Sequence, residues 1–169
     1  MPLRLTLIAA VSDDGYISAG KGIPWHLPDD VAHFRAFTEG KHLLVGGSTY
    51  DEMTGWFRPQ HTVHVLGKPR SPAAPKVRFY PDLGTLLQTA GREIDAIIVI
   101  GGSSIYEQTI QAASQLVITH VHTQLGQGKP FPDIRESDWT VVRQQHHPAD
   151  SRHALPFSIV TYNTSVLRG

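Results

Sequence analysis

The feature that most constrains this fold is the alternation of short apolar runs with segments of helical periodicity over residues 5–123. Short runs rich in Val, Ile and Leu are typical of buried strands, and several of the segments between them have the pattern of helices. Strands joined through helices form right-handed crossovers, so the sequence predicts an α/β protein with a mostly parallel sheet and helices on both faces. The expected strands are 5–11, 41–46, 61–67, 77–80, 95–102 and 114–123, and the expected helices begin after Pro28 and cover 48–53, 82–91 and 103–113.

The C-terminal part of the chain departs from this alternation. Residues 138–146 and 157–166 have strand composition and no helical segment between them, so we expect an antiparallel pair that closes one edge of the sheet. No internal repeat or domain-sized linker interrupts the chain, and the turn-rich segment 68–76 has the length of an ordinary loop. We therefore expect residues 1–169 to form one domain.

Composition excludes several classes of protein. Lys plus Arg equals Asp plus Glu at 15 each, so no overall field attracts nucleic acid or an anionic membrane. The absence of cysteine excludes disulfides, thiol catalysis and thiolate metal sites. No stretch approaches the roughly 18 to 20 apolar residues of a membrane span, and the N-terminal run lacks the features of a signal peptide. We expect a soluble cytoplasmic protein without nucleic-acid or membrane partners.

The stretch GIPWHLPDDVAHFRAF, residues 22–37, places an acid on an apolar helix face. Phe34 and Phe37 follow Asp30 by four and seven positions, so the three side chains share one face of the helix expected after Pro28. Asp29 lies about 100° away around the helix and can face water. An acid in a first helical turn has a purely structural use at the helix dipole. A buried carboxylate, however, needs a partner, and it can accept two parallel N–H bonds from an amidine-like ligand edge.

Two glycine pairs stand where an expected strand turns into an expected helix. They are Gly46-Gly47 and Gly101-Gly102. In an open α/β sheet, ligands bind beyond the carboxyl ends of the strands, where helix amides can meet phosphate and glycine permits close backbone approach. Each pair alone is equally compatible with a structural turn. Together they predict a cradle for the two ends of a dinucleotide.

Ten histidines raise the question of a metal site. His120 and His122 would share one face of a strand, which is a usable ligand spacing. No cysteine or acidic residue lies beside them, and strand histidines are usually half-exposed side chains. We expect no metal site. The sequence also lacks a Gly-x-Ser-x-Gly elbow, which leaves no support for a hydrolase.

Six motifs follow one another along nearly the whole chain: LIAAV, GIPWHLPDDVAHFR, GSTYDEM, VIGGSSIYEQ, ITHVHT and FPDI. In this order the chain resembles dihydrofolate reductase, and the Pro-Trp-x-Leu-Pro-x-Asp stretch is specific to that family. The resemblance implies an eight-stranded, mostly parallel sheet in a domain spanning residues 1–169. It also implies a monomeric, NADPH-dependent oxidoreductase that reduces 7,8-dihydrofolate, a small-molecule substrate, to tetrahydrofolate. Hydride would arrive at C6 while a water delivers a proton to N5.

The resemblance implies a role for each matched position. Asp30 would bind the 2-amino group and N3 of the pterin, Thr119 would hydrogen-bond Asp30, and Trp25 would hold an ordered water. Ile23 would lie near the nicotinamide, in the family's mobile active-site loop. The pterin pocket would be lined by Ile8, Ala9, Phe34, Met53 and Ile100. The cofactor would contact Ala10, Ile17, Gly46, Ser48, Thr49, Leu66, Lys68, Gly101, Gly102, Ser104, Ile105 and Tyr106.

Departures from the family pattern affect both ends of the site. Gly47 stands where the family has the arginine that faces the 2′-phosphate, so we expect Lys68 to supply that cation, with Arg70 in reserve. His61 falls at or near the arginine that grips the folate glutamate carboxylate, and Arg58 could substitute for it. The acid that steadies the family's active-site loop, in Gly-Asp-Thr before Phe-Pro-Asp, is also missing.

Two other functions remain open at this point. One is the related reductase of riboflavin biosynthesis, which shares the fold and NADPH and acts on a ribosylamino-pyrimidine phosphate. The other is a nucleotide-binding module without catalysis, which the missing arginine motivates. The intact PWHLPDD run favours the dihydrofolate reductase interpretation over both.

Overall fold

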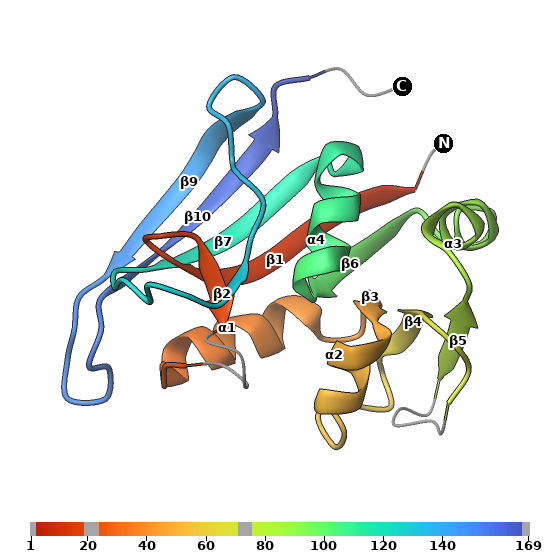
Figure 1. Ribbon diagram of the computed structural model, residues 1–169, viewed down its shortest axis with the longest axis horizontal. Coiled ribbons are helices and arrows are strands. Elements are labelled where there is room, and N and C mark those ends of the chain that lie inside the picture. Colours follow the sequence, from red (N-terminus) through yellow and green to blue (C-terminus); the bar gives the residue numbers. More distant parts are fainter. Residues whose placement is uncertain (1–2, 19–23, 71–75, 167–169) are drawn as a thin grey trace.

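The computed structural model describes residues 3–18, 24–70 and 76–166, and its centre is an eight-stranded sheet (Figure 1). The strand order is β5-β4-β3-β6-β1-β7-β10-β9, and every pair from β5 to β7 is parallel. The strands are β1 (Arg4–Ser12), β3 (His42–Gly46), β4 (Thr62–Leu66), β5 (Val77–Tyr80), β6 (Ala96–Gly101), β7 (Gln115–Val121), β9 (Trp139–His147) and β10 (Phe157–Thr164).

The C-terminal strands form the expected antiparallel edge. β10 is antiparallel to both β7 and β9, and β9 is the last strand of the sheet. The predicted α/β class with an antiparallel C-terminal pair is therefore confirmed. A second, two-stranded sheet of β2 (Tyr16–Ser18) and β8 (Lys129–Pro130) was not predicted, because strands of three and two residues carry no periodicity that a sequence pattern can reveal.

Local sequence explains where the helices begin. Pro28 occupies the first turn of α1 (Pro28–Thr38), where its missing N–H is not needed. The Asp82 carboxylate accepts a hydrogen bond from the Thr85 amide and so caps α3 (Leu83–Ala90). The remaining helices are α2 (Gly47–Glu52) and α4 (Ser103–Thr109), with α4 continued by the 3₁₀ turn η1 (Ile110–Ala112).

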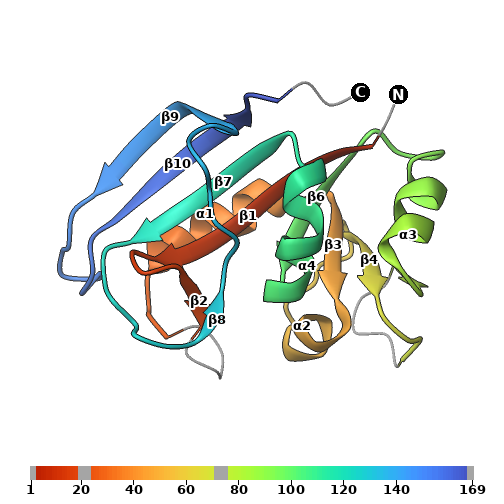
Figure 2. The same ribbon diagram turned by 45° about the horizontal axis from the view of Figure 1, so that its top comes forward.

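Alternating strand residues build a core on each face of the sheet. Leu5 and Leu7 of β1 lie on the face covered by α3 and α4, where they join Ile105 and Tyr106. Ile8 lies on the opposite face, in a cluster that includes Phe34 of α1. Figure 2 shows α1 and α4 on opposite sides of the sheet. Helices thus cover both faces of the parallel part of the sheet, which leaves the carboxyl edge of the parallel strands as the place for a ligand.

A chain of polar side chains lies next to the buried strand β4. His64 of β4 is 3% exposed, and its two ring nitrogens lie 3.1 Å from His42 Nδ1 and 2.9 Å from the Tyr80 hydroxyl. Burial lowers the pKa of His64 to about 4. Native packing therefore requires a neutral imidazole at this position. Across the described segments, no helix combines the length and the apolar composition needed to cross a membrane.

The neutral His64 makes stability depend on pH. An unfolded histidine binds a proton below about pH 6.5, whereas folded His64 does so only near pH 4. Its contribution is fully present above pH 6.5 and is lost as the pH falls toward 4. In this window we expect His64→Gln to reduce the slope of the unfolding free energy against pH. The reduction should be at most 2.303RT per pH unit, which is the value for one bound proton. Urea unfolding at several pH values measures the slope, and His26→Gln, at an exposed position, is the matched control. Equal slopes for His64→Gln and the unmodified protein would contradict the assignment.

Candidate active site

A cavity of about 1140 Å³ opens at the carboxyl edge of the parallel strands, between α1 on one side and the starts of α2 and α4 on the other. It brings together nearly all of the residues predicted for the site. Those that line it are Ile8, Ala9, Ala10, Ile17, Trp25, Asp30, Phe34, Gly46, Ser48, Thr49, Met53, Leu66, Ile100, Gly101, Gly102, Ser104, Ile105, Tyr106 and Thr119. Ile23 lies outside the described residues.

Asp30 places a carboxylate in the apolar part of this cavity. It belongs to the first turn of α1, and its Oδ1 accepts a 2.6 Å hydrogen bond from the hydroxyl of Thr119 on β7. Burial raises the pKa of Asp30, and the Thr119 hydrogen bond and nearby His33 oppose that rise. Thr119 engages one carboxylate oxygen, which leaves Oδ2 for a ligand. The predicted contact between Asp30 and Thr119 is present.

The sequence analysis missed His33, which lies one helical turn after Asp30. Its Nε2 atom is buried and has no hydrogen-bond partner among the described residues. Burial lowers the pKa of His33, and Asp30 opposes that shift. The spacing of three residues from Asp30 places both side chains on one helix face, and this signal was available in the sequence. Val31, Trp56 and Lys129 also line the cavity and were not predicted.

The two glycine pairs meet at the other end of the cavity because β3 and β6 are adjacent parallel strands. A Cβ on Gly102 would lie 2.7 Å from Thr49 Oγ1, and a Cβ on Gly46 would lie 2.8 Å from Ile105 Cγ1. Gly101 has φ of +127°, a conformation that favours glycine, and the Gly101-Gly102 peptide bond is cis. The turns therefore need glycine in order to approach each other.

Arg70 occupies the space beside Gly47 that a larger side chain would fill. A Cβ on Gly47 would lie 2.6 Å from Arg70 Nη2. The guanidinium is held by a 2.8 Å ion pair from Nη1 to Asp51 and by a 3.0 Å hydrogen bond from Nε to the Lys68 carbonyl. The cation missing from position 47 is thus supplied to nearly the same place from position 70.

Four predicted site residues do not line the cavity: Arg58, His61, Lys68 and the reserve candidate Arg70. The structure corrects the expectation for His61. It is 1% exposed and stacks on Trp56 with 5.1 Å between ring centroids, and its Nδ1 accepts the Arg58 backbone N–H. Burial, with help from Arg35 and Arg58, lowers its pKa. A buried, neutral imidazole cannot act as a pH-dependent cation for a carboxylate at the cavity.

Arg58 and Lys68 lie on the surface near the cavity. Arg58 is exposed, close enough to His61 and Arg35 for its charge to lower the pKa of both. Lys68 is also exposed, and only its carbonyl takes part in the arrangement around Gly47, through Arg70. The reserve candidate, Arg70, is the better-placed cation.

His120 and His122, the pair considered as metal ligands, bond to separate partners. His120 Nε2 lies 2.7 Å from the Tyr162 hydroxyl. His122 bonds to Asp13 through Nδ1 and to Ser158 through Nε2. Both rings are thereby engaged in hydrogen bonds between strands and loops of the C-terminal half of the sheet.

Known proteins of similar sequence and structure share one description. A family model for dihydrofolate reductase matches residues 4–164. Dihydrofolate reductase type 3 of Salmonella typhimurium is 30% identical over 159 residues, which cover 94% of this chain and 97% of that protein. Dihydrofolate reductase of Neisseria gonorrhoeae is 28% identical over 160 residues, which cover 95% and 98%.

A solved structure has the same fold. It is dihydrofolate reductase from Enterococcus faecalis complexed with NADP(H) and RAB-propyl, with a TM-score of 0.84 and 24% identity. The match covers 98% of this chain and 100% of that one. At this identity the similarity establishes the architecture.

Removal of the Thr119 hydroxyl should change the pKa of Asp30. Thr119→Val deletes a hydrogen bond that stabilises the ionised carboxylate, so we expect the pKa of Asp30 to rise further. Carbon-13 NMR titration of the Asp30 carboxyl measures it directly. Thr119→Ser keeps the hydroxyl and is the matched control. An unchanged Asp30 titration in Thr119→Val would show that the hydrogen bond does not act on the ionised form.

Proposed function

The chain belongs to the dihydrofolate reductase family, and from this membership we propose that its cavity reduces 7,8-dihydrofolate to tetrahydrofolate with NADPH. The observation that carries the proposal is the Asp30 carboxylate, set among apolar side chains at one end of a cavity whose other end is formed by two glycine turns. One end suits a polar heterocycle, and the other suits the phosphates of a dinucleotide.

Asp30 would orient the substrate ring. Its carboxylate would accept hydrogen bonds from the 2-amino group and N3 of the pterin, while Thr119 stays bonded to Oδ1. Ligand N–H groups favour the ionised carboxylate and so offset the burial that raises its pKa. Such a contact is worth most in a site from which water is excluded.

Hydride transfer requires two rings in contact and little else from the protein. Ile8, Ala9, Phe34 and Ile100 would form apolar walls that hold the pterin against the nicotinamide. A water bound near Trp25 would deliver the proton to N5 as hydride reaches C6. The chain supplies position, exclusion of water and one fixed charge, and the cofactor supplies the hydride.

NADPH would lie along the glycine turns. The similar Enterococcus faecalis enzyme was solved with NADP(H), and the glycine turns here line one end of the cavity. Thr49 lies beside Gly102 and would contact phosphate, and Arg70 would face the 2′-phosphate in place of the expected Lys68. This assigns cofactor recognition to a side chain that reaches Gly47 from another loop.

The folate tail would meet Arg35 and Arg58 in place of His61. Arg35 lies over the Trp56 ring, 4.2 Å from its centroid, and donates to the Trp56 carbonyl. Trp56 itself lines the cavity. Burial, followed by the charges of the two arginines, lowers the pKa of His61, so we assign the positive charge at this point to Arg35 and Arg58. The expected monomeric state and cytoplasmic location stay predictions, as does the absence of a nucleic-acid partner.

One assay separates the proposed reaction from its alternatives. NADPH oxidation followed at 340 nm is expected with dihydrofolate. Oxidation with a ribosylamino-pyrimidine phosphate instead would indicate the riboflavin-pathway reaction, and oxidation with neither substrate would leave a nucleotide-binding module. Either of the last two outcomes overturns the proposal.

Asp30→Asn tests the residue at the centre of the proposal. Because it breaks a buried charge–ligand contact, we expect kcat/KM for dihydrofolate to fall by about 100-fold or more. NADPH affinity, measured by fluorescence, should stay nearly unchanged, since the cofactor end is remote from α1. Asp95→Asn is the matched control, because Asp95 is exposed before the amino end of β6. Equal behaviour of the two variants would refute the role of Asp30.

Arg70→Ala tests cofactor recognition. Loss of a charged contact to the 2′-phosphate should raise KM for NADPH about tenfold and leave KM for NADH almost unchanged. The preference for NADPH should shrink as salt is added, because Arg70 is partly exposed. Lys68→Ala is the matched comparison and should have a smaller effect. A larger effect from Lys68→Ala would assign recognition of the 2′-phosphate to Lys68 instead of Arg70.

A further inference from the structure

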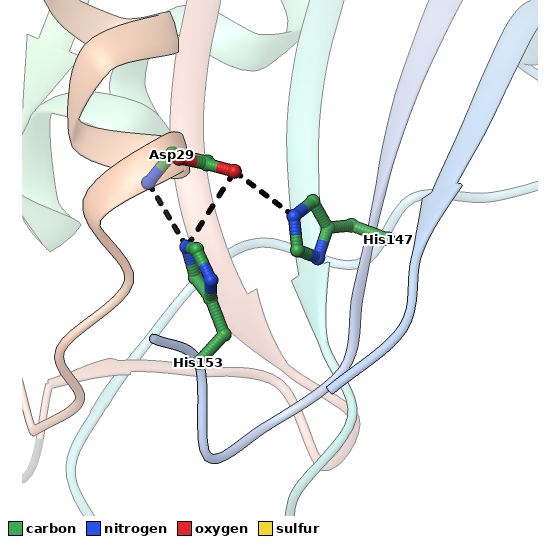
Figure 3. Close-up of side chains that lie close together, drawn as sticks. All are labelled: Asp29, His147 and His153. Carbon is green, nitrogen blue, oxygen red and sulfur yellow. Dashed lines mark hydrogen bonds and ion pairs between the residues drawn. The ribbon is translucent and has the colours of Figure 1, made fainter. Parts of the chain in front are cut away.

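Asp29, His147 and His153 form a compact cluster outside the proposed active site (Figure 3). Asp29 belongs to the first turn of α1, His147 ends β9, and His153 lies in the loop between β9 and β10. Asp29 Oδ2 is 3.0 Å from His147 Nε2 and 3.9 Å from His153 Nε2. One atom from each of the three residues lies within 4.8 Å of the others.

The far side of each imidazole is already anchored. His147 Nδ1 donates to the Pro148 carbonyl at 2.8 Å, and His153 Nδ1 donates to the Asp150 carboxylate at 2.8 Å. A histidine that donates from one ring nitrogen to a carbonyl or carboxylate presents the other nitrogen to a metal, and this is the usual arrangement around protein-bound zinc. Both Nε2 atoms here face Asp29.

Access and shape also suit an ion. His153 is buried, whereas the side chains of Asp29 and His147 are 44% and 25% exposed, so the cluster is fixed on one side and open to solvent on the other. A cavity of about 240 Å³ adjoins it, lined in part by Asp29, His147 and His33. A water bound to an ion there would offer the unpartnered His33 Nε2 a hydrogen bond.

An ion would replace the direct 3.0 Å bond between Asp29 Oδ2 and His147 Nε2, and two further contacts of these residues bear on its binding. Arg152 bonds to Asp29 Oδ1, not to the Oδ2 that faces the histidines. His153 Nε2 accepts the Asp29 backbone N–H at 3.0 Å, and an ion at this nitrogen would displace that first-turn amide. Ligands about 2.0 to 2.1 Å from a tetrahedral ion are about 3.3 Å apart, so Asp29 Oδ2 and His153 Nε2 would approach each other by about half an ångström. The two Nε2 atoms, which lie within 4.8 Å of each other, would also have to reach this separation.

We propose that Asp29, His147 and His153 bind a divalent transition-metal ion, with Zn²⁺ as the best match and a water in the fourth position. Two imidazoles and one carboxylate form a ligand set that zinc accepts, and Asp150 completes a carboxylate–histidine–metal arrangement. The bound ion would tie the β9–β10 loop to the start of α1, which is the turn that also carries Asp30.

Titration of the chelator-treated, full-length protein with ZnCl₂ tests the site. Calorimetry should show one equivalent bound whose affinity falls at least about tenfold in both His147→Gln and Asp29→Asn. The melting temperature of the unmodified protein should rise with Zn²⁺ and that of the variants should not. CoCl₂ in place of ZnCl₂ should give the visible absorption of a four- or five-coordinate ion.

Two controls separate this site from other histidines. His42→Gln breaks the close pair of His42 with His64. His146→Gln breaks the close pair of His146 with His122 and changes the residue next to His147. Both should bind Zn²⁺ as the unmodified protein does. If Asp29→Asn does not fold by circular dichroism, His147→Gln decides. Absence of binding, or binding that His147→Gln leaves intact, would overturn the proposal.

Discussion

The arrangement of this protein depends on one constraint: a carboxylate must be held among apolar side chains. Asp30 is carried by α1 into the cavity, and among the described residues its one side-chain hydrogen bond comes from Thr119 of β7. A single neutral donor does not cancel the cost of burial, which is why the pKa of Asp30 is raised despite it. The free protein thus keeps an incompletely satisfied acid, and a ligand with two N–H donors completes its hydrogen bonding. Stability is given up at this point in return for affinity, as is common for residues that bind ligands.

At the proposed cofactor end, Arg70 places a positive charge beside Gly47, where the family resemblance implies an arginine. Gly47 has no side chain, and Arg70 fills the vacated volume from the loop after β4, held in place by Asp51 and the Lys68 carbonyl. An arginine at position 47 would collide with this guanidinium, so the two solutions exclude each other. The ion pair with Asp51 reduces the charge that Arg70 presents, but it also fixes the guanidinium near the opening of the glycine turns, which lowers the entropy cost of binding.

Sequence reasoning recovered what local pattern and motif spacing encode. The pattern of apolar runs predicted the sheet and its antiparallel edge. Nineteen of the site residues predicted from the sequence line the cavity. His61 shows what the sequence could not predict. Its stacking on Trp56 and its hydrogen bond from the Arg58 amide depend on the shape of the turn before β4, which motif spacing does not reveal. Arg70 was ranked second because nothing in the sequence shows that its side chain folds back over Gly47. The sequence pattern predicted that Asp29 can face water, and its side chain is 44% exposed. The pattern did not predict the partners more than 100 residues away that also bond to it.

The two neighbouring acids of α1 acquire different surroundings from helix geometry alone. A separation of about 100° turns Asp30 toward the cavity and Asp29 toward the β9–β10 loop. Because both belong to the same helical turn, any contact that fixes Asp29 also limits how far Asp30 can move. His147, His153 and Arg152 all bond to Asp29, so the loop between β9 and β10 braces the amino end of α1 from outside the cavity. His33 borders both the active-site cavity and the smaller one beside Asp29, which makes this turn the physical link between the two.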